Sequence, residues 1–333
     1  MKKTLSAFLL SLFLLSLFPG CGEEKAEATL FVMDTASTLR LEGGKAEEAL
    51  SRMKEELTRL DALLDAEGEV LSSLGRGETV RNGELATLLR ETLRFSRETG
   101  GALDVTVNPA VEAWGFRSGN YRVPSSGELS ALKEYVGWEK LSPEGDLISL
   151  PGGFSLTLGA VAKGYAGDRL RAIAGECGVK RGVLSLGGNV VLIGEKKEDT
   201  GWSVAVRAPE GGYALTLSLS DAMAVTSGSY ERYFEKDGKR YHHILDPQTL
   251  SPAENGLLSV TVVSKNGLLA DALSTALFVM GPEKAAEHWR TYGESEGFEI
   301  LLLTGDHRIL ASKGIVPHIT GFGEGYGELV IIE

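Results

Sequence analysis

The chain has 333 residues, of which 34 are Lys or Arg and 46 are Asp or Glu, so its formal net charge at pH 7 is −12. Hydrophobic residues make up 43% and charged residues 24% of the sequence, as is usual for a globular protein. This acidic balance, without a basic run, argues against a nucleic-acid partner, because phosphate backbones are bound by clustered Lys and Arg. The 42 glycines predict many turns and close backbone approaches.

The N-terminus has the pattern of an export signal. Lys2 and Lys3 precede an apolar run over residues 5–18, which is short for a membrane span and fits the hydrophobic region of a signal peptide. The run ends in LFPGC, which resembles a lipobox except that Leu lies one position too far from Cys21. We therefore expect residues 1–21 to be a signal peptide, and the exported protein to be lipid-anchored through Cys21, facing the periplasm or the cell exterior. Secretion without a lipid is the alternative.

Residues 22–28 are expected to form a solvated tether, and 29–333 a single domain. Leucines that recur at spacings of three and four predict helices over 50–64 and 85–95. Further helices are expected at 128–136, 159–174, 270–280 and 283–292. Strands are expected at 29–43, from 104 to a break at Asn108-Pro109, and at 147–158, 182–186, 190–194, 202–207, 213–219, 222–226, 230–235, 240–245, 258–264, 298–304, 308–312 and 328–332.

The order of these elements predicts the fold class. Helices and strands are partly segregated, and turn signals such as Asp237-Gly238 separate strand-like runs. This pattern favours an α+β fold with mixed, largely antiparallel sheets flanked by helices.

The segment LGAVAKGYAGD over residues 158–168 is a candidate phosphate site. It places small residues and Lys163 at a strand-to-helix transition, where free backbone N–H groups and the helix dipole favour an anion. It lacks the Gly-Lys-Ser/Thr ending of a Walker A loop. The alternative is that the glycines only permit close packing and Lys163 is a solvated cation.

Two further turns are candidates to line a ligand site. LSLGGN over residues 184–189 is a strand that ends in two glycines and Asn189, which lets a backbone approach a flat ligand closely. The segment TSGS over residues 226–229 supplies hydroxyl and backbone donors after a strand. For both, an ordinary turn is the alternative.

The segment YHHILDP over residues 241–247 is a candidate for proton transfer. A histidine can take a proton from a hydroxyl nucleophile near neutral pH. Because side chains alternate along a strand, at most one of His242 and His243 is expected to point into a site. No metal-binding spacing accompanies the pair, so a structural role for both histidines is the alternative.

The segment ADALST over residues 270–275 is a candidate metal site. Asp271 and Thr275 lie four residues apart and thus share one helix face, where a carboxylate and a hydroxyl can hold a hard cation such as Mg²⁺. The alternative is an N-cap aspartate with a threonine bonded back to its own helix.

Together and in this order, these segments resemble the FAD:protein FMN transferase family, the ApbE-like flavin transferases. The family motifs LGxxAKGYxxD, LGGN, TSGxYERYF, HHIxDP and ADALSTALFVxG correspond to residues 158–168, 186–189, 226–234, 242–247 and 270–281. Weaker matches are Met33-Asp34-Thr35, Asn108-Pro109 and Trp114-Gly115-Phe116. The resemblance runs from about residue 30 to the end and implies an ApbE-like flavin transferase fold.

The resemblance implies that FMN moves from FAD to a Thr or Ser hydroxyl of an exported acceptor protein, with release of AMP and a requirement for Mg²⁺. It implies that Asp271, Thr275 and the carbonyl of Ala160 hold the magnesium, and that Asp271 and His243 are catalytic, His243 activating the acceptor hydroxyl. The implied FAD contacts and cleft residues are Met33, Trp114, Gly115, Phe116, Thr157, Lys163, Asn189, Ser227, Gly228 and Ile244. Asp246 either orients His243 or starts a turn with Pro247.

The sequence departs from the family at Thr157, where the family usually has an Asp that contacts FAD, and near 68–77, where a family Asn is absent. Both changes affect the expected balance between transfer and hydrolysis. The alternatives are therefore a Mg²⁺-dependent FAD pyrophosphatase that gives FMN and AMP, and a lipoprotein that binds FAD without catalysis. A purely structural lipoprotein would leave the glycine and histidine clusters without a use.

Overall fold

The computed structural model describes residues 23–196 and 200–333, so the predicted signal peptide and Cys21 lie outside the described residues. Its centre is a nine-stranded sheet in the order β1-β2-β6-β7-β10-β15-β16-β17-β19. Every neighbouring pair in this sheet is antiparallel except β17 and β19, which are parallel. The predicted α+β class with largely antiparallel pairing is confirmed.

The central strands are β1 (Lys25–Val32), β2 (Thr35–Glu42), β6 (Arg181–Leu186), β7 (Asn189–Ile193), β10 (Met223–Gly228), β15 (Leu257–Ser264), β16 (Phe298–Thr304), β17 (Ile309–Ser312) and β19 (Leu329–Ile332). The α-helices are α1 (Ala46–Leu64), α2 (Glu69–Gly75), α3 (Gly83–Glu98), α4 (Asn108–Trp114), α5 (Ser126–Leu132), α6 (Ala162–Glu176), α7 (Gly267–Met280) and α8 (Pro282–Glu296). Short 3₁₀ helices lie at Lys133–Tyr135, Trp138–Lys140 and Val316–His318.

Four small sheets complete the described part. One consists of β18 (Ile319–Phe322), β9 (Tyr213–Leu219) and β8 (Trp202–Arg207). Another consists of β3 (Val80–Arg81), β5 (Leu147–Ser149) and β4 (Ser142–Glu144). Two hairpins pair β11 (Tyr233–Lys236) with β12 (Lys239–His242), and β13 (Leu245–Asp246) with β14 (Ser251–Pro252).

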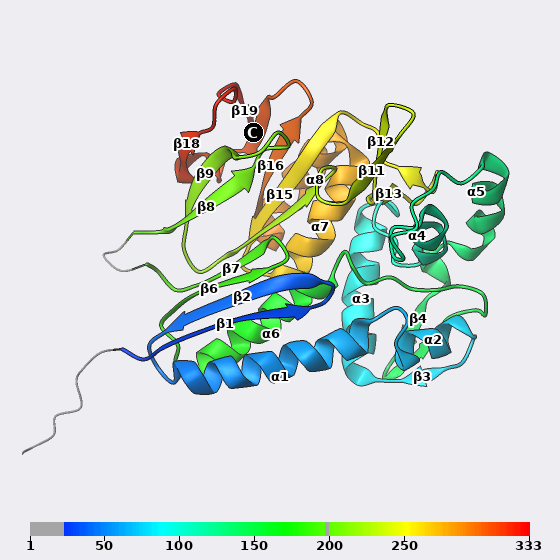
Figure 1. The fold of residues 1–333 in the computed structure, drawn as a ribbon, viewed down its shortest axis with the longest axis horizontal. Helices are drawn as coiled ribbons and strands as arrows, with labels where there is room; N and C mark the ends of the chain where they lie inside the picture. Colours follow the sequence, from blue (N-terminus) through cyan, green and yellow to red (C-terminus); the bar gives the residue numbers. More distant parts are fainter. Residues whose placement is uncertain (1–22, 197–199) are drawn as a thin grey trace, which may run out of the picture.

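The central sheet is covered on both faces, which explains why β15 is buried along nearly its whole length. Helices α1, α6, α7 and α8 pack on one face, while β8 and β9 lie over the other (Figure 1). The apolar stripe of α1, which includes Leu50, Met53 and Leu57, is buried in the main hydrophobic core, where α1 packs against α6 and β1, as its spacing predicts. Among the described residues, no helix is both long enough and apolar enough to cross a membrane.

The predicted tether is wrong from Lys25 onward, because β1 starts there and pairs with β2 in a hairpin. The strand expected over 29–43 is therefore two strands. Their two-residue turn, Met33-Asp34, has positive φ at both positions and lacks the Asn-Gly or Asp-Gly signature of such turns. The N–H of Met33 donates to Asp61 Oδ1 at 3.1 Å, a support from α1 that the local sequence does not reveal.

Two other strand predictions are wrong. No strand forms at 104–107, because the Asp104 carboxylate accepts the N–H of Thr106 at 2.8 Å and folds the chain into a turn. The following Pro109 does not break an element but lies in the first turn of α4, as its second residue, where its missing N–H costs no hydrogen bond. The strand expected over 147–158 ends at Ser149, and Gly153 beyond it has a φ of +91°.

The docked start of the chain supplies a helix cap to α1. The N-cap residue of α1, Lys45, makes no side-chain cap, and Glu24 Oε1 instead accepts the N–H of Glu47 at 2.6 Å. Glu23 forms ion pairs with Lys180, at 3.2 Å, and with Arg181. Both acidic residues therefore bind the folded domain rather than water alone.

We expect Glu24→Ala to lower the free energy of unfolding by about 1 kcal/mol, the usual worth of a helix N-terminal cap. The measurement is urea denaturation followed by far-UV circular dichroism. Glu55→Ala, an exposed change on the same helix, is the control and should stay within about 0.5 kcal/mol of wild type. Equal stabilities of the two variants would show that Glu24 does not cap α1.

Candidate active site

Helices α6 and α7 cross at two glycines. A Cβ on Gly164 would lie 2.1 Å from the carbonyl oxygen of Gly267 and 2.5 Å from Cβ of Asp271. A Cβ on Gly267 would in turn lie 2.5 Å from the carbonyl oxygen of Gly164. Since real Cβ atoms do not come so close to other atoms, only glycine at these positions allows the two backbones to touch.

Asp271 uses this close approach to join three segments of the chain. Its Oδ2 accepts the N–H of Gly164 at 2.7 Å, and its Oδ1 accepts the side-chain amide of Asn189 at 3.1 Å. Gly164 is the third residue of α6, whose N–H has no partner inside the helix, so the Asp271 carboxylate caps α6 and lies at the positive end of its dipole. Both Asp271 and Asn189 are buried.

Asp168 makes the reciprocal contact, from α6 to the start of α7. Its Oδ1 and Oδ2 accept the N–H groups of Gly267 and Leu268 at 2.8 and 2.9 Å. Burial raises the pKa of Asp168, while the two N–H donors act in the opposite direction. Each helix therefore caps the other with a carboxylate, which fixes their register.

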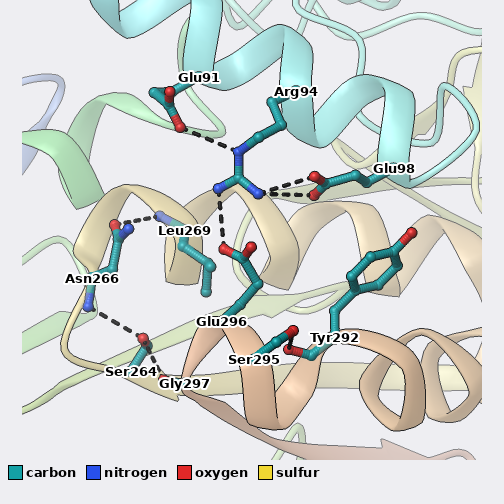
Figure 2. Close-up of polar contacts among 10 residues, drawn as sticks. All are labelled: Glu91, Arg94, Glu98, Ser264, Asn266, Leu269, Tyr292, Ser295, Glu296 and Gly297. Carbon is teal, nitrogen blue, oxygen red and sulfur yellow. Dashed lines mark hydrogen bonds and ion pairs between the residues drawn. The ribbon is translucent and has the colours of Figure 1, made fainter.

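Short polar contacts hold the junction between β15 and α7 (Figure 2). The Asn266 side chain accepts the N–H of Leu269 at 3.0 Å, and its own N–H donates to Ser264 Oγ at 3.2 Å. Ser264 Oγ donates to the carbonyl of Gly297, at the end of α8, at 2.9 Å. Asn266, and not Asp271, is thus the N-cap residue of α7, so the N-cap alternative for Asp271 is wrong.

The same close-up shows how α3 is tied to the end of α8 (Figure 2). The guanidinium of Arg94 lies 3.0 Å from Glu98 on its own helix and 3.2 Å from Glu296 on α8. It also lies 3.2 Å from Glu91. The Arg94 side chain is only 29% exposed to solvent. Its ion pairs join two helices that flank α7.

Three hydroxyl groups meet beside Asp271. Ser227 Oγ, on β10, lies 2.8 Å from Ser274 Oγ and 3.2 Å from Thr275 Oγ1, both on α7. Ser274 Oγ donates to the carbonyl of Asp271 at 2.9 Å. The predicted ligands Asp271 and Thr275 therefore belong to one hydrogen-bonded group, and the threonine hydroxyl turns to a neighbouring strand rather than back to its own helix.

His243 follows β12 and is held in one tautomer. Its Nδ1 lies 3.1 Å from the carbonyl of Arg232, and because a carbonyl only accepts, Nδ1 carries the proton and Nε2 has a free lone pair. Removal of the ring from water lowers its pKa to about 3, and the charges of Arg232 and Lys163 add to this effect, although the side chain keeps partial exposure. His243 is thus a neutral imidazole at physiological pH.

His242 and Asp246, which lie close to His243 in the sequence, both bind backbone groups. His242 is buried, and its Nε2 lies 3.1 Å from the carbonyl of Ala253, whereas His243 lies beyond the end of β12 and keeps partial exposure. Asp246 Oδ1 accepts the N–H of Gln248 at 2.8 Å, which is the contact of a turn-initiating aspartate. Of the two readings left open for Asp246, the structure favours the turn.

An aromatic cluster supports His243 from one side. It contains Trp114, Phe116, Tyr121, Phe234 and Tyr241, with ring centroids 5.2 to 6.4 Å apart. The Phe116 ring meets the His243 ring edge-on at 6.4 Å. Trp114 and Phe116 are buried, and the Trp114 indole N–H donates to the carbonyl of Leu250 at 2.8 Å.

Gly115 makes the turn between these two aromatic residues. Its φ is +77°, and a Cβ there would lie 2.1 Å from the carbonyl oxygen of Asn120. Glycine is therefore required for both reasons, and the turn sets the position of Phe116 beside His243.

The remaining predicted residues lie on segments that adjoin those already described. A Cβ on Gly187, in the turn before Asn189, would lie 2.5 Å from Thr35 Oγ1, which places the Met33 hairpin against this turn. Thr157 and Ala160 are half-buried in the segment that leads into α6, and Lys163 lies in the first turn of α6 with Nζ 3.4 Å from the carbonyl of Gly159. Gly228 ends β10 one residue after Ser227, and Ile244 is buried one residue after His243.

The donor set fits a magnesium ion rather than a softer metal. Within the described ranges, no group of three or more His, Cys, Asp and Glu side chains is placed to hold a metal. Magnesium needs only one or two carboxylates and takes its other ligands from hydroxyl, carbonyl, water and phosphate oxygens. Each Asp271 oxygen accepts one N–H and keeps a second lone pair, so Asp271, Thr275 and the Ala160 carbonyl are compatible with such a site.

A surface cavity of about 510 Å³ lies elsewhere, at the C-terminal half of α6. Its lining includes Asp168, Arg171, Lys180, Asp221 and Lys265, and none of the predicted catalytic, metal or FAD-contact residues. Arg171 donates to the Lys265 carbonyl and pairs with Asp221 at 3.3 Å, so its charge is already engaged. We do not assign the chemistry to this cavity.

Three residues that organise the site were not predicted to do so: Gly164, Asp168 and Ser274. Gly164 and Asp168 lie within the segment 158–168. The position of Asp168, one helical turn after Gly164, is the signal in the sequence that could have identified the pair. Ser274 lies between the predicted ligands, but a serine in an apolar helix gives no sign of which strand it will face.

The fold and site define an α+β protein built on a largely antiparallel sheet, with a buried carboxylate that caps α6, a group of hydroxyls and a neutral histidine. Residues 33–301 match the ApbE family. The FAD:protein FMN transferase of Escherichia coli (strain K12) is 35% identical over 234 residues, which are 66% of this chain and 64% of the relative. That of Treponema pallidum (strain Nichols) is 33% identical over 264 residues, covering 74% and 72% of the two chains.

The crystal structure of the ApbE protein from Thermotoga maritima MSB8 superimposes with a TM-score of 0.82 at 30% identity, covering 90% of this chain and all of the other. This chain belongs to the ApbE family. Its matched region spans slightly less than two thirds of the E. coli relative's own length.

We expect Gly164→Ala to lower the free energy of unfolding by about 1–3 kcal/mol, because the new methyl group would collide with the backbone of α7. Gly175→Ala is the matched control, since nothing lies within 4 Å of a Cβ at that position of the same helix. It should raise stability by about 0.5–1 kcal/mol. Thermal and urea unfolding measure both, and a Gly164→Ala variant as stable as Gly175→Ala would disprove the close crossing.

Proposed function

We propose that this protein is a FAD:protein FMN transferase, which moves FMN from FAD to a Thr or Ser hydroxyl of a protein acceptor. Its family and the named relatives support the reaction class. The observation that carries the proposal is the convergence of three distant segments on Asp271, with Thr275 in the same hydrogen-bonded group.

The proposed reaction is a displacement at phosphorus. The acceptor oxygen forms a bond to the FMN phosphorus of the FAD pyrophosphate, and the bond from that phosphorus to the bridging oxygen breaks, so that AMP leaves with the bridging oxygen. His243 Nε2, which has a free lone pair, takes the hydroxyl proton. Lys163 and the N-terminus of α6 attract the pyrophosphate through their positive charge.

We propose that Mg²⁺ binds at Asp271, Thr275 and the carbonyl of Ala160. When bound, it supplies charge neutralisation for the pyrophosphate oxygens and the leaving phosphate. The residues of the chain orient this donor set: Asn189 and the Gly164 N–H fix the Asp271 carboxylate, and Ser227 binds Thr275.

The cellular location is a prediction from the sequence. We propose that the protein is exported, loses its signal peptide and is anchored to a membrane through a lipid on Cys21. An exported acceptor and an anchored transferase would then meet in the same compartment.

The mature chain without its lipid-bearing Cys21 (residues 22–333), incubated with FAD, Mg²⁺ and a Thr/Ser-containing candidate acceptor domain, should give a fluorescent acceptor in a denaturing gel and one AMP per flavin transferred. His243→Ala should slow the transfer by about 100-fold or more, because it removes the proton acceptor. Asp271→Asn should abolish the transfer. Asp306→Ala, a change at an exposed turn, should leave the transfer rate unchanged.

Product analysis separates the alternatives in this experiment. AMP and FMN in equal amounts without a labelled protein would indicate a FAD pyrophosphatase. FAD that is retained without either product would indicate a binding protein and would contradict both enzymatic functions.

We expect the transfer rate to show no loss of activity near pH 6.5 as the pH falls from 8 to 5.5. A free imidazole with an ordinary pKa would become protonated in this range, whereas the pKa of His243 is lowered to about 3 and Nε2 stays available as a base. Initial rates across this range measure the effect. A loss of rate centred between pH 6 and 7 in the wild type, absent from the residual rate of His243→Ala, would contradict the neutral histidine.

A further inference from the structure

The three hydroxyl groups beside Asp271 have a fixed direction of hydrogen bonding. Each hydroxyl has one proton to donate. Ser274 uses its proton on the carbonyl of Asp271, at 2.9 Å, because a carbonyl oxygen can only accept. In the contact of 2.8 Å between Ser227 and Ser274, Ser227 must therefore be the donor.

The same reasoning fixes the donor in the contact between Ser227 and Thr275. Because Ser227 has given its proton to Ser274, it can only accept in its contact of 3.2 Å with Thr275. The Thr275 proton therefore points toward Ser227, and the oxygen lone pairs of Thr275 are left free on its other sides. A cation is attracted by lone pairs and repelled by a hydroxyl proton, so this order prepares Thr275 as a ligand.

We propose that Ser227 and Ser274 are positioning residues that hold the Thr275 hydroxyl in the orientation required to bind Mg²⁺. This inference rests on the magnesium site of the proposed function. The relay Thr275→Ser227→Ser274 ends on the backbone carbonyl of Asp271, whose carboxylate is fixed separately by the Gly164 N–H and Asn189. Ser274 is fully buried, so water does not replace it as the acceptor of the Ser227 proton.

Loss of either serine has a specific consequence. Without Ser227, the Thr275 proton loses its acceptor and is free to turn toward the cation. Without Ser274, the Ser227 proton loses its acceptor and turns to Thr275, which reverses the last bond and directs the Thr275 proton outward. Both changes should weaken magnesium binding while Asp271 and Thr275 themselves remain.

The test is titration calorimetry of the mature chain with MgCl₂ alone, in the absence of FAD, so that the readout is binding and not turnover. Ser227→Val and Ser274→Ala should each raise the Kd for Mg²⁺ by about tenfold, the lower end of what the loss of an orienting partner costs. Ser227→Thr, which matches Val in shape but keeps the hydroxyl, should stay within about twofold of the wild type.

A second control separates orientation from stability. Ser96 is also a fully buried helical serine, and its hydroxyl donates to the Thr92 carbonyl on α3 at 3.1 Å. Ser96→Ala should lower the melting temperature about as much as Ser274→Ala does, but leave the Kd for Mg²⁺ unchanged. A purely structural role for Ser274 would give both variants the same affinity.

The outcomes distinguish this inference from the proposed function. Equal magnesium affinity in wild type, Ser227→Val and Ser274→Ala would overturn the relay and leave the magnesium site intact. Equal losses in Ser227→Thr and Ser227→Val would also overturn it, because the hydroxyl would then not matter. A wild-type protein that binds no Mg²⁺ would overturn the magnesium site itself, and the relay with it.

Discussion

The close crossing of α6 and α7 is the constraint on which the candidate site depends. Gly164 and Gly267 let the two backbones touch, and only at this separation can Asp271 reach the N–H of Gly164 while Asp168 reaches the N–H groups of α7. The two carboxylates satisfy backbone donors that would otherwise have no partner at the helix ends. Packing and electrostatics thus fix the same geometry, and a wider crossing would lose both at once.

The site is assembled from segments that the sheet brings together. Asn189 begins β7 and Ser227 lies on β10, the next strand, so both side chains reach α7 from the layer beneath it. His243 comes from a separate hairpin that rests on an aromatic cluster, and its Nδ1 is held by the backbone carbonyl of Arg232. Helix α7 and the sheet beneath it therefore hold the carboxylate and hydroxyl groups, while a small second core positions the proton acceptor.

Much of the fold and site could be predicted from the sequence, because the signals were local. The leucine spacing of α1 gave its buried face, and the α+β class followed from the order of elements. Asp271 and Thr275 share a helix face because they lie one turn apart, and the structure places them as expected. Two errors arose where distant contacts decide local structure: Asp61 supports the Met33 turn, and Glu24 caps α1 at a residue 23 positions further on. A third arose from a local contact that competes with the strand pattern, because Asp104 accepts the N–H of Thr106 two residues later.

The sequence by itself determined the fold class, the family resemblance and the residue types available for phosphate, metal and proton transfer, because periodicity and motif spacing are properties of the chain. Only the tertiary structure decided that Asn266 rather than Asp271 caps α7, that Asp246 forms a turn, and that Asp168 and Ser274 serve the site. It also decided the protonation of His243 and the direction of the hydroxyl relay. These follow from which carbonyl or carboxylate each group meets, and for Asp168 the partner lies 99 residues away in the chain.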